Sequence, residues 1–190
     1  MHRKLKLAFA SCIVAGLSLC LWGQGKQFRI GRAPQPGELR RWDTTVLPDG
    51  TGLPDGSGTA KRGENVYRNE CSGCHGDNGE GRQPLGPRLV GGAGTLRSTD
   101  PILTVGSFWP YATTVWEYTN RAMPYAKPGT LSYNDTYAVT AYLLYRNGIT
   151  RRDEVINRDS LPRVKMPNRE GFVPDTRPDV ISASPKRKPT

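Results

Sequence analysis

The sequence predicts a small all-α domain, with an extended N-terminal arm before it and a proline-rich tail after it. Residues 59–70 and 132–147 have the apolar periodicity and the end signals of helices. A Cys-x-x-Cys-His pentapeptide, from Cys71 to His75, directly follows the first of them. The 190 residues include 22 Gly and 16 Pro, so much of the remaining chain is expected to be loop.

The pentapeptide Cys71-Ser72-Gly73-Cys74-His75 has the pattern of the attachment site of a c-type haem. The two thiols lie one helical turn apart, so both can form thioethers with the vinyl groups of one haem. The adjacent His75 is then held under the iron as its proximal ligand. We therefore expect one covalently bound haem c, whose apolar surface would enlarge a small core.

Residues 1–25 have the pattern of a secretory signal, with a basic start, an apolar run over residues 7–22 and small residues at 23–25. The run is short for a membrane-spanning helix, which needs about 20 residues. An uncleaved N-terminal anchor is the alternative. The sequence thus predicts a periplasmic protein, attached to the membrane only if residues 1–25 are retained.

The cysteines favour haem over other sites. Cleavage after residue 25 would remove Cys12 and Cys20 and leave only Cys71 and Cys74. Two cysteines three residues apart are poorly placed to stabilise an exported domain by a disulfide bond. A zinc site would need further ligands, and the only other histidine is His2. A thioredoxin-like redox pair is the remaining alternative, but it does not account for the histidine or for the missing βαβ pattern.

The net charge is +10, and it is +7 without residues 1–25, which contain three Lys or Arg and no acidic residue. A basic chain can bind nucleic acid, but an exported one seldom meets any, so no nucleic-acid partner is expected. An acidic redox partner would suit this charge. An ordinary solvated basic surface explains it equally well.

Residues 26–58 show little periodicity and contain Asp-Gly pairs at 49–50 and 55–56, which predicts an extended arm. The first helix is expected to begin at Thr59, with Gly63, Val66 and Tyr67 on one face. A helical glycine costs about 1 kcal/mol relative to alanine. Gly63 therefore indicates that another backbone crosses closely there, and the helix over 132–147 is the expected neighbour.

The segment 76–94 is rich in glycine but lacks the Lys-Ser/Thr ending of a phosphate-binding loop, and no strand precedes it. A metal-bound histidine needs an acceptor for its other ring nitrogen. The carbonyl of Pro87, in a rigid part of this loop, is the candidate for His75. The alternative is that residues 86–89 form a simple turn with no role at a metal site.

A short helix is expected over 101–105, followed by aromatic residues at 108–111 and a helix over 112–120. Trp109 and Tyr111 carry N–H and O–H groups that could reach a haem propionate. Core packing is the alternative for both side chains.

Met123 is the candidate for the sixth iron ligand, because a thioether sulfur suits this position. It follows a helix, precedes Pro124, and lies about fifty residues beyond His75, where a loop that crosses the haem would return. The other methionine outside residues 1–25, Met166, lies in a proline-rich tail. A buried core residue is the alternative for Met123.

The helix over 132–147 has a capping serine, Ser132, with Asp135 three residues on and Gly148 after its end. The haem domain is thus expected to span residues 59–150. Prolines forbid a long helix in the tail, residues 151–190. We expect the tail to pack irregularly on the domain and to be disordered at its end.

The order of helix, Cys-x-x-Cys-His, loop, Met and aromatic C-terminal helix resembles the class I c-type cytochromes over residues 59–148. A narrower resemblance is to the cytochrome subunits of bacterial sulfur-oxidation dehydrogenases, namely SoxD of sulfane dehydrogenase and the cytochrome partners of sulfite dehydrogenase. The segments that carry it are LVGG (89–92), TVGSFWPYATT (104–114), RAMP (121–124), PGTLS (128–132), YAVTAYLL (137–144) and LPRVKMPNREGF (161–172).

This resemblance implies a non-catalytic electron-transfer subunit with a molybdenum-containing partner of the sulfite oxidase type. The chain would pass single electrons from that partner to an acceptor cytochrome c. Some SoxD proteins carry two haems, whereas this chain has one Cys-x-x-Cys-His and is expected to carry one. The alternatives are a general electron carrier of another respiratory pathway, or a haem sensor or enzyme in which Met123 is labile.

Overall fold

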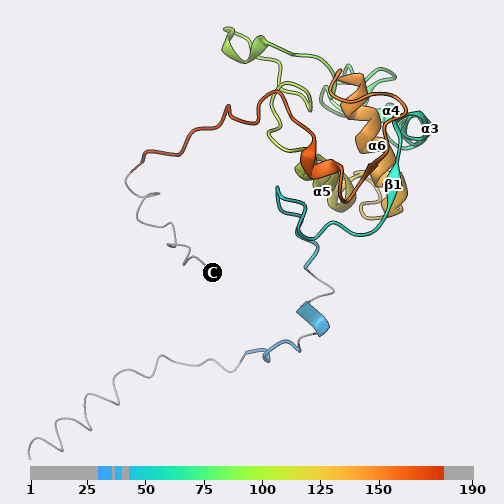
Figure 1. Cartoon of the computed structure of the whole chain (residues 1–190), viewed down its shortest axis with the longest axis vertical. Coiled ribbons are helices and arrows are strands. Elements are labelled where there is room, and N and C mark those ends of the chain that lie inside the picture. The colour runs from blue at the N-terminus through green and yellow to red at the C-terminus, as the bar shows by residue number, and fades with distance from the viewer. Residues whose placement is uncertain (1–29, 36, 40–42, 178–190) are drawn as a thin grey trace, which may run out of the picture. The chain divides into compact units, whose positions relative to one another are not determined.

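The computed structural model describes residues 30–35, 37–39 and 43–177. The chain divides into two compact units, Met1–Asp43 and Thr44–Thr190. The elements of the second unit, in chain order, are β1 (Ser57–Gly58), α3 (Ala60–Glu70), α4 (Ser72–His75), η1 (Thr95–Arg97), α5 (Ala112–Ala122), α6 (Tyr133–Arg146), β2 (Ile156–Asn157) and η2 (Leu161–Arg163) (Figure 1).

Helix α3 forms as the sequence predicts. The hydroxyl of Thr59 accepts a hydrogen bond from the Arg62 N–H at 3.4 Å and so caps the first turn. Its inward face buries Ala60, Gly63 and Tyr67. The pentapeptide follows α3 without a linker, because Cys71 is both the C-cap of α3 and the N-cap of α4.

Two glycines allow the backbone to pack tightly against α6 at Ala138. A Cβ placed on Gly63 would lie 1.8 Å from the Ala138 carbonyl oxygen, and one on Gly58 would lie 2.3 Å from the Ala138 nitrogen. Only a residue without Cβ allows approaches this close. The prediction that Gly63 marks the contact of the first helix with the last is confirmed.

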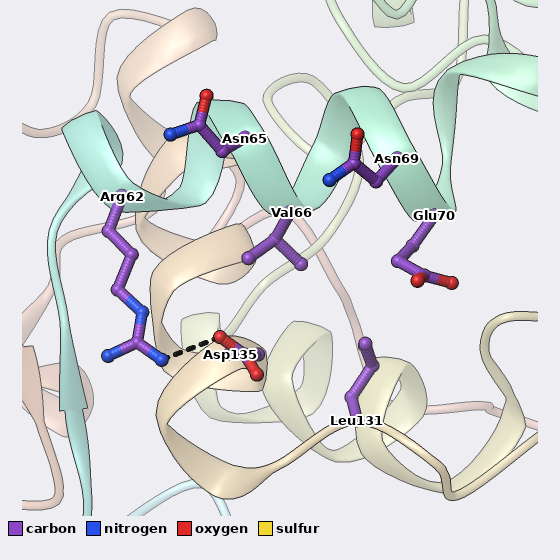
Figure 2. A pocket seen from close by; sticks show the side chains of 7 residues that line it. All are labelled: Arg62, Asn65, Val66, Asn69, Glu70, Leu131 and Asp135. Atoms are coloured by element: carbon purple, nitrogen blue, oxygen red, sulfur yellow. Dashed lines mark hydrogen bonds and ion pairs between the residues drawn. The ribbon is translucent and has the colours of Figure 1, made fainter.

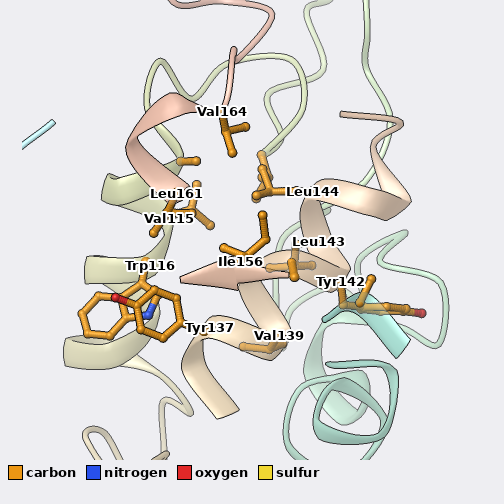
Figure 3. Packing of buried hydrophobic residues seen from close by; sticks show 14 of the residues in the cluster. Val115, Trp116, Tyr137, Val139, Tyr142, Leu143, Leu144, Ile156, Leu161 and Val164 are labelled. Atoms are coloured by element: carbon orange, nitrogen blue, oxygen red, sulfur yellow. The ribbon is translucent and has the colours of Figure 1, made fainter. Parts of the chain in front are cut away.

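Helix α6 begins and ends close to the predicted bounds. The Ser132 hydroxyl accepts from the Asp135 N–H at 3.1 Å, and Gly148 after the helix has φ +71°. The inner face of α6 supplies much of the core, in which the Trp116 ring of α5 lies 5.2 Å from that of Tyr137. Figure 3 shows side chains of α5, α6, β2 and η2 meeting in this core.

The first half of the tail belongs to the core of the second unit. Strand β2 pairs antiparallel with β1, with Gly58 opposite Ile156. Four tail side chains are buried: Ile156, Leu161, Val164 and Met166. The mainly helical architecture therefore includes a two-stranded sheet that the sequence did not predict. The predicted signal segment and the predicted disordered end of the tail lie outside the described residues.

The prediction of a helix over residues 101–105 is wrong. Its place is taken by a turn in which the Thr104 hydroxyl accepts from the N–H groups of Gly106 and Ser107, each at 3.2 Å. The Ser107 hydroxyl in turn donates to the Ile102 carbonyl at 2.6 Å. Short hydroxyl side chains compete with helix formation by such local bonds. Helix α5 runs to Ala122, two residues further than predicted.

Within the described part of the chain, no helix has the length and apolar composition needed to cross a bilayer.

Candidate haem site

The pentapeptide forms a single helical turn. The N–H groups of Cys74 and His75 donate to the Cys71 carbonyl at 3.1 and 3.0 Å. The two thiols are free rather than joined by a disulfide, with Cys71 half-buried and Cys74 exposed. Both sulfur atoms and the imidazole are thus carried by one rigid turn, as thioether attachment of a haem requires.

Burial raises the pKa of the Cys71 thiol to about 12, with smaller contributions from the nearby charges of Glu70 and Cys74. The Cys71 side chain packs against the hydrophobic core. A thiolate is therefore disfavoured at this position, whereas a neutral sulfur is accommodated. A thioether is neutral, so the surroundings of Cys71 fit a covalently attached haem.

The Nδ1 atom of His75 lies 2.8 Å from the Pro87 carbonyl oxygen, which is the contact that the sequence predicted. Nδ1 must carry the proton in this bond, because a carbonyl can only accept. In the neutral ring Nε2 is then the unprotonated nitrogen, the one that can bind a metal. Gly86 allows the loop to come this close, since a Cβ there would lie 2.7 Å from the Cys74 carbonyl oxygen.

Residues 79–91, which we call the proximal loop, are fixed by backbone bonds to the pentapeptide and to themselves. The Gly81 N–H donates to the His75 carbonyl at 2.8 Å. The N–H groups of Leu89 and Val90 both donate to the Gly79 carbonyl, at 2.8 and 3.0 Å. The position of the Pro87 carbonyl is therefore set by the whole loop.

Met123 is the C-cap of α5, where its N–H donates to the Thr119 carbonyl at 3.1 Å, and it is half-buried. The loop after it is tied to α3 by an ion pair between Lys127 and Glu70, with 2.7 Å between Nζ and Oε2. Met166, in contrast, is 4% exposed and is part of the hydrophobic core. Met123 is thus the more accessible of the two thioethers.

Trp109 and Tyr111 are both half-buried and lie in contact with different parts of the chain. The Trp109 ring packs edge-on against Tyr118, with centroids 5.7 Å apart. The Arg169 guanidinium of the tail lies 5.1 Å from the centroid of the Tyr111 ring. Their polar groups form no hydrogen bond to any part of the chain that the structure describes, so both donors are available to a ligand.

The tail residues near this aromatic segment were not predicted as part of the site. The Asn168 side chain donates to the Phe108 carbonyl at 2.7 Å, and the rings of Phe108 and Phe172 lie 5.2 Å apart. Arg169 belongs to the same segment. The sequence predicted that the tail packs on the domain but not which residues it contacts, because contacts between residues about 60 apart leave no local periodicity.

Two surface grooves lie beside α3. One, of about 340 Å³, lies between α3 and the start of α6, where Arg62 and Asp135 form an ion pair at 2.7 Å (Figure 2). The other, of about 300 Å³, lies beside the other face of α3. Neither is lined by the thiols of the pentapeptide, His75 or Met123. The donor groups, rather than a cavity, therefore identify the site.

The donor set fits a haem c. Two neighbouring thiols are available for thioether bonds, the imidazole has its Nδ1 occupied and its Nε2 free, and a thioether follows at Met123. When bound, the haem would supply an iron that alternates between ferrous and ferric states.

Comparison with known proteins agrees with this assignment. The family model described as cytochrome c oxidase, cbb3-type, subunit III matches residues 58–143. Among solved structures, the sulfane dehydrogenase SoxCD from Paracoccus pantotrophus is similar, with 44% identity and a TM-score of 0.73. The match covers 84% of this chain and 80% of that one. No curated protein matches the chain at a significant level.

The match to SoxCD extends well beyond the pentapeptide and spans most of both chains. The fold, the donor set and the two matches agree on one family. The chain belongs to the class I c-type cytochromes, with a covalently bound haem c and a role in electron transfer, and it resembles the cytochrome subunit of sulfane dehydrogenase.

Proposed function

We propose that Cys71 and Cys74 bind the haem through thioethers and that His75 Nε2 and the Met123 sulfur are the axial ligands of its iron. The hydrogen bond of His75 Nδ1 to the Pro87 carbonyl, at 2.8 Å, is the observation that carries this proposal. Metal-bound histidines generally donate their second N–H to such an acceptor, which fixes the ring and increases its basicity.

With His75 and Met123 both holding the iron, the haem would have no open site for a substrate. Ligation by His and Met also raises the reduction potential, as suits an electron acceptor. The chain therefore acts as a non-catalytic carrier of single electrons. Trp109 and Tyr111 are proposed to donate to the haem propionates, since their polar groups have no partner in the described part of the chain.

The electron donor is proposed to be a molybdenum-containing subunit of the sulfite oxidase type that oxidises sulfite or a sulfane group, and the acceptor a second cytochrome c. The similarity to SoxCD supports this partnership. The tail segment 161–172, which carries part of the resemblance to SoxD, is a fixed part of the fold, because it includes the buried residues Leu161, Val164 and Met166. We further propose that the protein is periplasmic, with residues 1–25 as its signal or its anchor.

Purification of the tagged holoprotein from its native host tests the partnership. The molybdenum subunit should co-purify, and sulfite or a sulfane-sulfur compound should reduce the haem only when that subunit is present. Reduction at the same rate without any molybdenum protein would contradict the proposal and favour a general electron carrier.

A further inference from the structure

Asn147, the C-cap of α6, joins that helix to the proximal loop. Its side-chain Nδ2 donates to the Leu143 carbonyl of its own helix at 2.8 Å and to the Leu89 carbonyl of the loop at 3.1 Å. Its Oδ1 accepts from the Gly91 N–H at 3.0 Å. One side chain therefore holds two backbone groups of the proximal loop, and both groups come after Pro87 in the chain.

The pattern of partners suits a carboxamide. The nitrogen faces two carbonyl oxygens and the oxygen faces an N–H group, which fixes the orientation of the amide. A carboxylate would present an oxygen to both carbonyls, and an aliphatic side chain would leave all three backbone groups without this partner. The Leu89 and Leu143 carbonyls would keep the N–H groups of Val105 and Asn147 as donors, at 3.3 and 3.2 Å, whereas the Gly91 N–H would lose Asn147 Oδ1 as its acceptor.

The surroundings hold the carboxamide in place. A Cβ on Gly106 would lie 2.4 Å from Asn147 Oδ1, so the glycine leaves the room that the amide occupies. The carbonyl of Gly91 accepts from the Thr104 hydroxyl at 2.5 Å. Gly91 is thus held through its N–H by Asn147 and through its carbonyl by Thr104.

We propose that Asn147 is a positioning residue for the proximal ligand: by fixing Leu89 and Gly91, it holds the Pro87 carbonyl against His75 Nδ1. This inference rests on the proposed ligation by His75. A firm hydrogen bond makes the imidazole a better electron donor to the iron and so favours the ferric state. Loosening the loop should weaken that bond and raise the reduction potential.

The test compares Asn147→Leu and Asn147→Asp with wild type as holoproteins. The exchange of the His75 Nδ1 proton with solvent is followed by NMR in the reduced, diamagnetic state, and the reduction potential is measured by titration. We expect exchange about tenfold faster, as the loss of one or two hydrogen bonds allows, together with a higher potential.

Asn134 provides a matched control at the other end of α6, where its Oδ1 accepts from the Ser57 N–H at 2.8 Å. Asn134→Leu should lower the free energy of unfolding without changing proton exchange or potential. If the Asn147 variants lose stability but keep wild-type exchange and potential, Asn147 is only a helix cap and the inference is wrong.

Thr104→Val covers the case in which neither Asn147 variant folds, because it removes the other bond that holds Gly91. It should accelerate exchange in the same direction, and an unchanged rate would overturn the inference. A wild-type protein in which haem-bound His75 shows no protected Nδ1 proton would instead contradict the hydrogen bond on which the proposed ligation rests. The two failures are therefore distinguishable.

Discussion

Lys127 Nζ lies 2.7 Å from Glu70 Oε2 and joins the loop after Met123 to the residue before Cys71. The two segments that carry the proposed iron ligands are thus connected by an ion pair on the protein surface. The Lys127 side chain is 55% exposed and that of Glu70 is 28% exposed, so solvent screens the pair and its contribution to global stability is small.

Lys127→Met should therefore loosen the Met123 loop with little change in overall stability. We expect a cost of about 0.5–1 kcal/mol at most, and hence about two- to fivefold tighter binding of imidazole to the ferric haem in place of Met123. Spectroscopic titration with imidazole measures this. Arg152→Met, which removes the pair of Arg152 with Glu64 at 2.8 Å, is the control and should leave imidazole affinity unchanged.

Gly63→Ala should disrupt the packing of α3 on α6. The new methyl group would lie 1.8 Å from the Ala138 carbonyl oxygen, and neither backbone can move without opening the core. The expected loss is about 3 kcal/mol or more, the upper range for overpacking, which outweighs the helix-propensity gain of about 1 kcal/mol. Urea unfolding measures it. Asn69→Ala, on the exposed side of α3, should be neutral or slightly stabilising, and equal effects of the two changes would refute this packing.

Ile156→Ala tests whether the tail is part of the folded domain. Ile156 is fully buried among side chains of α5, α6 and η2 (Figure 3), so its truncation should cost about 2–5 kcal/mol. The neighbouring Val155 is 52% exposed, and Val155→Ala should change the unfolding free energy by less than about 0.5 kcal/mol. If Ile156→Ala were as mild as its neighbour, the tail would not be packed as the structure has it.

Tyr137 should contribute a pH-dependent part of the stability. Its hydroxyl donates to the Pro54 carbonyl at 2.9 Å, and burial raises the pKa of the phenol to about 12. The unfolded chain ionises near pH 10, so the contribution of the neutral phenol is fully present below about pH 10 and is lost as the pH rises toward 12.

The variant Tyr137→Phe should thus be about 1 kcal/mol less stable than wild type at pH 8. This difference should shrink as the pH rises above about 10. Urea unfolding at a series of pH values checks both statements. Tyr133→Phe, at a side chain that is 51% exposed, should follow the wild-type pH dependence throughout. A constant difference between wild type and Tyr137→Phe would contradict the raised pKa.

Features with a local chemical cause could be predicted from the sequence. The caps Thr59 and Ser132 depend on a side chain and an N–H group three residues apart. The close approach at Gly63 follows from the cost of glycine in a helix. The His75–Pro87 contact could be expected because a rigid loop follows the pentapeptide and a ligating histidine needs an acceptor.

Features that depend on distant contacts could not be predicted. The pairing of β1 with β2 involves two residues in each strand, too few for any periodicity. Asn147 reaches residues 56 and 58 positions away, and Arg169 meets Tyr111 only because the tail returns over the domain. The helix predicted over 101–105 was wrong because the hydroxyl groups of Thr104 and Ser107 satisfy the local backbone instead.

The most direct test of the account is the far-red charge-transfer absorption band that a methionine sulfur gives when it is bound to a ferric haem. The oxidised wild-type protein should show this band, should bind carbon monoxide poorly when reduced, and should lose the band in Met123→Ala. Met166→Leu, a conservative change in the core, should keep it. A wild-type protein that lacks the band and binds carbon monoxide readily would contradict His75–Met123 ligation and the electron-carrier role.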